Sequence, residues 1–197
     1  MAFVFRKDFY AKPLVVVLTK RTDSTKYGFD LTGKTVKFRM WLCASGTVTD
    51  KIIATSTGVT IHPAKSFTFD VTNDWLYSVD HGIVNGDEIE LTTTGSLSGT
   101  GFAVSTRYFA RDVSGHKFRL GLSPSGSAIE VAAAGSGTHS FKIIGSVKYT
   151  WAAGDLNTVN TYRAEWQVGD GTDFEVLPAN ESGQGGFEIK VIGDGCT

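Results

Sequence analysis

The sequence has little of several residue types, and each scarcity excludes a class of protein. Of its 197 residues only 11 are leucine and 7 are glutamate, against 51 that are valine, isoleucine or threonine. This balance excludes a coiled coil or a helical bundle and favours strands. Proline is scarce, with 4 residues, whereas glycine reaches 23 and can supply the turns between strands. A hydrophobic fraction of 41% excludes a disordered chain.

Cysteine is nearly absent as well. The two that occur, Cys43 and Cys196, form no Cys-x-x-Cys or Cys/His spacing. We therefore expect no metal site, and nothing in the sequence indicates a cofactor. Whether the two cysteines form a disulfide is left open, although so low a count is typical of a chain that folds in a reducing cytoplasm.

Long apolar runs and an excess of charge are both missing. The longest aliphatic run, residues 14–18, is too short to cross a bilayer, and the N-terminus has no signal-peptide core. We therefore expect no membrane partner and no export through a cleaved signal. The 19 basic residues are balanced by 20 acidic ones. Since a protein that neutralises several phosphates usually carries a basic excess, we expect no nucleic-acid partner.

Alternating apolar and polar residues predict several half-buried strands. The alternation runs through residues 36–42, 147–151, 162–168 and 187–191. Residues 14–19 are almost continuously apolar, which predicts a strand buried on both faces. Short strands with turns between them and no helical stretch predict an all-β chain with an antiparallel β-sandwich over residues 13–65 and 143–192. Residues 193–197 would form a tail.

The middle of the chain, residues 66–142, is richer in glycine, serine and threonine. Strand-sized pieces lie between these tracts, at residues 88–91, 107–113, 117–122 and 128–131. They recur too regularly for a linker. We expect a small β domain, either barrel-like or a sandwich, inserted into a loop of the larger sandwich, where a long insertion costs little closure entropy.

The first twelve residues, 1–12, contain four aromatic side chains: Phe3, Phe5, Phe9 and Tyr10. A short aromatic end of this kind predicts either an edge strand or an arm that packs on a neighbour, and the sequence leaves both open. Either would make these residues a protein interface.

Trp41 is a further candidate interface residue. It lies among Lys37 and Arg39, on the strand face opposite Phe38. Because tryptophan, tyrosine and arginine are enriched at interfaces, this position indicates a contact surface. The alternative is a tryptophan that the inserted domain covers.

Three segments resemble a known family. They are Asp30–Met40 (DLTGKTVKFRM), Gly145–Asp155 (GSVKYTWAAGD) and Thr161–Val168 (TYRAEWQV), followed by Leu177-Pro178 and Phe187–Val191. Together they resemble the immunoglobulin-like domain found at the start of tailed-phage upper baseplate proteins. The inserted piece resembles a second phage-tail element through Asp80–Ile89 (DHGIVNGDEI), Arg107–Asp112, His116–Leu120, Ala128-Ile129 and Gly135–His139.

The resemblance implies an immunoglobulin-like sandwich and a non-enzymatic structural protein of a tailed-bacteriophage virion, made in the bacterial cytoplasm. Its partners would be other phage structural proteins and further copies of itself in a symmetric oligomer. A tail, neck or collar station suits the chain as well as the baseplate. The alternative is a carbohydrate- or receptor-binding module of the particle, with the loops of the insert as its contact surface.

Catalytic patterns are weak in this sequence. His81 stands beside Asp80, with further carboxylates nearby, but the spacing gives no helical i, i+4 pair. We interpret it as a turn in which Gly82 and Gly86 adopt positive φ and Asp87 accepts backbone amides. No serine lies in a nucleophile elbow. The carboxylates that could cleave a glycoside are Glu165, Asp170, Asp173 and Glu175, and nothing singles out a pair. We therefore expect no catalytic residues, although a tail-associated hydrolase is a third possibility.

Overall fold

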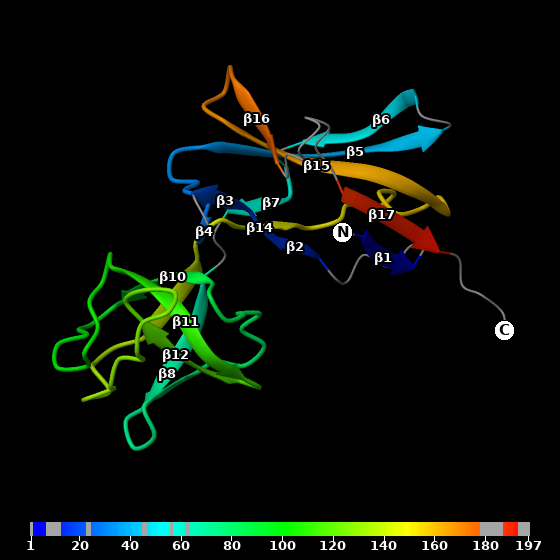
Figure 1. Ribbon diagram of the computed structural model, residues 1–197. Helices are drawn as coiled ribbons and strands as arrows, with labels where there is room; N and C mark the ends of the chain where they lie inside the picture. Colours follow the sequence, from blue (N-terminus) through cyan, green and yellow to red (C-terminus); the bar gives the residue numbers. More distant parts are fainter. Residues whose placement is uncertain are drawn as a thin grey trace, which may run out of the picture. The chain divides into compact units, whose positions relative to one another are not determined.

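The computed structural model describes residues 2–6, 13–22, 25–44, 47–55, 57–61, 64–177 and 187–192 (Figure 1). These residues form strands and turns, with no helix among them, so the all-β prediction is confirmed. The chain divides into two compact units. One comprises Met1–Leu18, Asp30–Ile61 and Val147–Thr197, and the other Thr19–Phe29 and His62–Ser146. The segment Thr19–Phe29, within the range expected for the sandwich, groups with the second unit.

The first unit is built on one large sheet. Its strands run in the order β1 (Ala2–Arg6), β17 (Phe187–Ile192), β15 (Asn160–Gly169), β5 (Thr35–Ala44) and β6 (Thr47–Thr55), with β16 (Phe174–Leu177) also paired to β15. The neighbours are antiparallel except β1 and β17, which run parallel. In Figure 1 the blue β1 lies beside the red β17 at one edge of this sheet.

A smaller sheet completes the sandwich, and aromatic rings fill the space between the two. Its strands are β2 (Leu14–Val17), β14 (Ser146–Tyr149) and β7 (Val59–Ile61). Phe38 on β5 is fully buried and stacks on Tyr149 of β14 with ring centroids 4.5 Å apart. Trp151 and Trp166 contact the same phenyl ring at 5.8 and 5.1 Å. Phe38 therefore joins the two layers.

The period-2 pattern predicted three strands of the large sheet, β5, β15 and β17, and one strand of the small sheet, β14. Val36, Phe38 and Met40 are all buried, as the alternation in β5 requires. The prediction that residues 14–19 are buried on both faces is wrong, since Val15 is 51% exposed. The strand is four residues long in a three-stranded sheet, and one of its faces is not covered at Val15.

The second unit contains a closed antiparallel barrel. Its strands run in the order β10 (Glu88–Thr93), β11 (Arg107–Ser114), β12 (Lys117–Gly121), β9 (Trp75–Tyr77), β8 (Lys65–Asp70) and β13 (His139–Ile143), which pairs back to β10. The interior is apolar, with Leu76, Ile89, Leu91 and Phe118 fully buried. The predicted strand at 128–131 is wrong, because this segment makes only an isolated bridge between Gly121 and Ala128.

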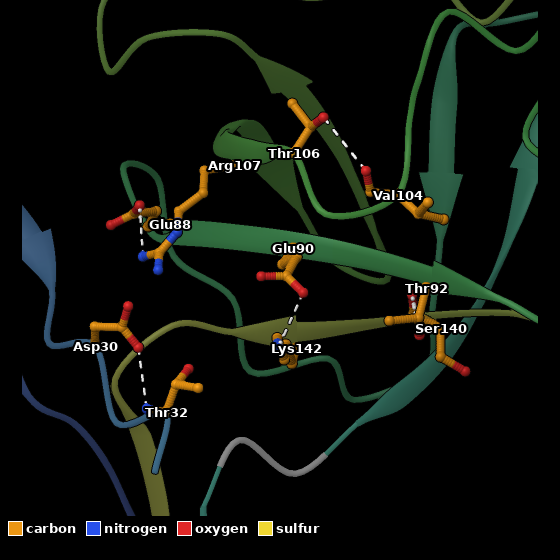
Figure 2. A network of polar contacts seen from close by, with 10 residues as sticks. All are labelled: Asp30, Thr32, Glu88, Glu90, Thr92, Val104, Thr106, Arg107, Ser140 and Lys142. Atoms are coloured by element: carbon orange, nitrogen blue, oxygen red, sulfur yellow. Dashed lines mark hydrogen bonds and ion pairs between the residues drawn. The ribbon is translucent and has the colours of Figure 1, made fainter. Parts of the chain in front are cut away.

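A hairpin of β3 (Thr19–Thr22) and β4 (Thr25–Gly28) belongs to the same unit. The amide of Gly28 donates to Oε2 of Glu88 at 3.1 Å, while Oε1 of Glu88 accepts from Arg107 at 3.0 Å. Figure 2 shows the pair of Glu88 and Arg107, and beside it the pair of Glu90 and Lys142. A side chain on Gly28 would place Cβ only 2.4 Å from the carbonyl oxygen of Ile144, so this approach requires glycine.

Candidate functional site

The first candidate surface is the sheet edge formed by β1. Its residues align in parallel with β17, from Ala2 opposite Glu188 to Arg6 opposite Ile192. Phe3 and Phe5 lie opposite Ile189 and Val191, whose side chains are buried. Two of the predicted interface residues are thus on an edge strand, while Phe9 and Tyr10 lie outside the described residues.

The opposite edge of the same sheet, β6, is built differently. Its pairing with β5 shifts register twice, between Met40 and Trp41 and between Leu42 and Cys43. The strand also carries Asp50 and Lys51 in its middle. Bulges and charged residues are the usual means by which an edge strand avoids pairing with another chain. The β1 pairing has an unbroken register over its five residues, and the charged residue of β1, Arg6, stands at the end of the strand rather than in its middle.

Trp41, the other predicted interface residue, is largely buried within the single chain. Its side chain is only 9% exposed, and the guanidinium of Arg39 lies 5.9 Å from the ring centroid. Among the described residues its Nε1 has no hydrogen-bond partner. Since little of the ring is accessible in the single chain, Trp41 is not part of either candidate surface.

Two of the four carboxylates considered for glycoside cleavage, Glu165 and Asp170, are held by structural contacts of their own. Glu165 is buried and accepts from Nη1 of Arg39 at 2.6 Å. Asp170 accepts hydrogen bonds from the backbone amides of Asp173 and Thr172, which hold its pKa below the usual range. Within the described ranges, no group of three or more His, Cys, Asp or Glu side chains could hold a metal ion.

The second candidate surface is a groove on the barrel, which we call the β8–β9 groove. It has a volume of about 530 Å³ and is lined by residues 65–68 and 77–80. Tyr77 and Val79 are 46% and 60% exposed, and Ser66, Thr68 and Asp80 are exposed as well. This groove was not predicted from the sequence, although the alternation of Trp75, Leu76 and Tyr77 could have indicated two outward aromatic rings.

Three hydrogen bonds fix the backbone of the groove. Oγ of Ser78, which is buried, donates to the carbonyl oxygen of Ser66 at 2.7 Å. The ammonium of Lys65 donates to the carbonyl oxygen of Asp80, and the amide of Asp80 donates to Nδ1 of His116 at 3.4 Å. Asp80 has a φ of 49°, a left-handed conformation that few residues other than glycine adopt.

The turn after the groove has the structure that its sequence predicted. Gly82 and Gly86 have φ values of 70° and 90°, and the carboxylate of Asp87 accepts the amide of Val84 at 2.9 Å. His81 is 5% exposed, and its Nδ1 accepts the amide of Ile83 at 2.9 Å. Burial lowers the pKa of His81, and the positive charge of Lys65 acts in the same direction.

Next to the groove, two cations cover Trp75. The ammonium of Lys117 lies 4.6 Å from its ring centroid, and the guanidinium of Arg119 lies 4.3 Å away. Arg119 also donates to the carbonyl oxygens of Asn73 and Asp74. These cations already have partners in the chain, so they do not form an open basic row.

No helix in the described part of the chain is long and apolar enough to span a membrane. Comparisons with protein-family models, with curated proteins and with solved structures find no match.

Proposed function

We propose that this protein is a non-enzymatic structural subunit that assembles with neighbouring copies by exchanging strand β1, which pairs with β17 of a neighbour. The observation that carries the proposal is the parallel pairing of β1 with β17. Strands that pair in parallel within one chain need a long crossover connection, and here it is the whole protein from β1 to β17. No turn ties the two strands together, so β17 can be paired equally well by β1 of a neighbour.

The short connection after β1 also supports an exchange of β1 strands between neighbouring copies. Residues 7–13 join Arg6 at the end of β1 to Leu14 at the start of β2. Fully extended, they reach about 25 Å. A reach of this size suits a neighbouring molecule. In such strand addition the backbone hydrogen bonds give affinity, while the apolar partners Ile189 and Val191 favour the register seen here.

The setting that we propose is the virion of a tailed bacteriophage. The support for it is the set of motifs in Asp30–Met40, Gly145–Asp155 and Thr161–Val168, together with their position in the strands of a β-sandwich. In a symmetric particle each copy would both give and receive a β1 strand. Repeated weak contacts of this kind add up through multivalency.

The experiment compares variants of the full chain in their assembly. Val4→Pro removes one backbone donor from β1 and should prevent strand addition, whereas Val4→Thr keeps a β-branched residue of similar shape. We expect Val4→Pro to stay folded and monomeric and to be excluded from particles, as should a chain that lacks residues 1–12. Val4→Thr should assemble normally. Normal incorporation of the Val4→Pro chain or of the truncated chain would overturn the proposal.

A further inference from the structure

We propose that the β8–β9 groove is a binding site for a neutral carbohydrate, with room for one or two pyranose rings. The site lies wholly within the barrel unit. It is independent of the β1 edge, so binding and assembly can fail separately.

The groove opens where two strands part. Residues Thr68–Asp70 of β8 pair with β9, while Lys65–Phe67 pair with β13 instead. Beyond Tyr77 the chain leaves β8, and the side chain of Ser78 bridges the gap to the carbonyl oxygen of Ser66. The resulting groove is shallow and open to solvent, and its volume of about 530 Å³ lies within the range of small-ligand sites, roughly 300–1,000 Å³.

The walls of the groove combine one exposed aromatic ring with several polar groups. Tyr77 is 46% exposed at the rim, and the ring of His116 meets it edge-on with centroids 6.0 Å apart. Ser66 and Thr68 expose side chains that carry hydroxyls along the same groove. A pyranose ring has an apolar C–H face and a rim of hydroxyls. It therefore matches a site with an aromatic face and a few placed polar groups.

Asp80 is the polar group that the structure positions most closely. Its backbone is held at positive φ by Lys65 from β8 and by His116 from the turn between β11 and β12. Aspartate tolerates this conformation better than most residues, and the two contacts fix it at this position. Because the backbone is already fixed, an exposed carboxylate here can accept sugar hydroxyls with little further loss of entropy.

The local charge favours a neutral ligand over a polyanion. Lys65 stands against Asp80 within the groove. On the neighbouring strand, Lys117 and Arg119 lie against Trp75, and Arg119 is also 3.8 Å from the carboxylate of Asp112. A nucleic acid or a sulfated polymer would need unpaired cations along its path, and these cations are engaged with other groups of the barrel.

The test is a titration of the full chain with oligosaccharides, in which binding is monitored through the chemical shifts of the backbone amides. The probes are glucose-, galactose- and N-acetylglucosamine-based tetrasaccharides, with a sulfated heparin tetrasaccharide as the anionic arm. We expect at least one neutral probe to shift amides in residues 65–68 and 77–80 in a saturable way. The proposal is overturned if only the sulfated probe shifts them, or if no neutral probe does so at about 10 mM, which is weaker than most specific binding.

Two variants test the residues. Tyr77→Ala should weaken binding about tenfold or more, whereas Tyr77→Phe keeps the ring and should stay close to the parent. Asp80→Asn removes the charge but retains a residue that tolerates positive φ, so it should lose affinity without losing stability. Val84→Ala, at a position 62% exposed and outside the groove lining, is the matched control. Parent-like affinity in both Tyr77→Ala and Asp80→Asn would overturn the assignment.

Discussion

Nη1 of Arg39 donates to Oε1 of Glu165 at 2.6 Å, between residues that lie directly opposite each other on β5 and β15. The carboxylate is buried, whereas the Arg39 side chain keeps 29% of its surface exposed. The pair lies on the sheet face opposite Phe38 and Trp166, which belong to the core between the two sheets. It therefore joins the two central strands from outside that core.

Glu165→Ala should destabilise the first unit by about 1–2 kcal/mol, because Arg39 loses a charged hydrogen bond and solvent compensates only in part. The matched control is Arg163→Ala, two residues earlier on the same strand and exposed. Its effect should stay within about 0.5 kcal/mol. Urea unfolding of both variants measures the difference, and equal losses would show that the ion pair contributes nothing specific.

Glu88→Gln should loosen the hairpin of β3 and β4 from the barrel. The carboxylate accepts from both Gly28 and Arg107, and an amide offers a single oxygen to those two donors. The expected loss is about 1–3 kcal/mol, with faster hydrogen exchange at the Gly28 amide.

The control for that change is Glu90→Gln, on the same strand and two residues further on. Its ion pair with Lys142 keeps 20% and 28% of the two side chains exposed. Such a pair contributes at most about 1 kcal/mol. If hydrogen exchange at the Gly28 amide becomes faster by the same factor in both variants, Glu88 is not the residue that holds the β3–β4 hairpin to the barrel.

The turn around His81 should weaken in acid. Burial lowers the pKa of His81 in the folded chain below the ordinary value of 6.5, so the unfolded chain binds the proton more readily. Stability from this group is therefore complete above pH 6.5 and is lost as the pH falls through the lower, folded pKa. The charges of Lys65 and His116 also lower the pKa of His81, whereas the backbone hydrogen bond with Gly115 and the charge of Asp80 raise it.

His81→Asn tests the pH dependence, since an asparagine oxygen can accept the Ile83 amide two residues on without titrating. Urea midpoints measured between pH 8 and pH 5 should fall less for His81→Asn than for the parent chain. If the two curves run parallel over this range, titration of His81 does not control the stability of the turn.

The sequence predicted those strands in which one face is buried and the other polar. In β15, Tyr162, Ala164, Trp166 and Val168 are all buried, as the alternation indicated. Strand β13 was missed although it alternates in the same way, because His139 and Ser140 begin it and hide the apolar pattern of Phe141 and Ile143. Propensity alone does not reveal a histidine that points into a barrel.

The groove could not be predicted, because it depends on where two strands stop pairing. Nothing in residues 65–70 shows that β8 changes its partner from β13 to β9 at Thr68. The positive φ of Asp80 likewise depends on Lys65 and His116, which are distant in sequence. Local pattern defines the strands, whereas the site arises from their closure into a barrel.

The most direct test of assembly through β1 uses two chains that each carry one engineered cysteine. Both have Cys43→Ser and Cys196→Ser, and one adds Ala2→Cys while the other adds Glu188→Cys, at positions that face each other across β1 and β17. Adjacent strands lie within disulfide range. If β1 pairs with β17 of a neighbour, a disulfide-linked heterodimer should form when the two chains co-assemble under oxidising conditions. Co-assembly without that heterodimer, or chains that remain monomeric, would contradict it.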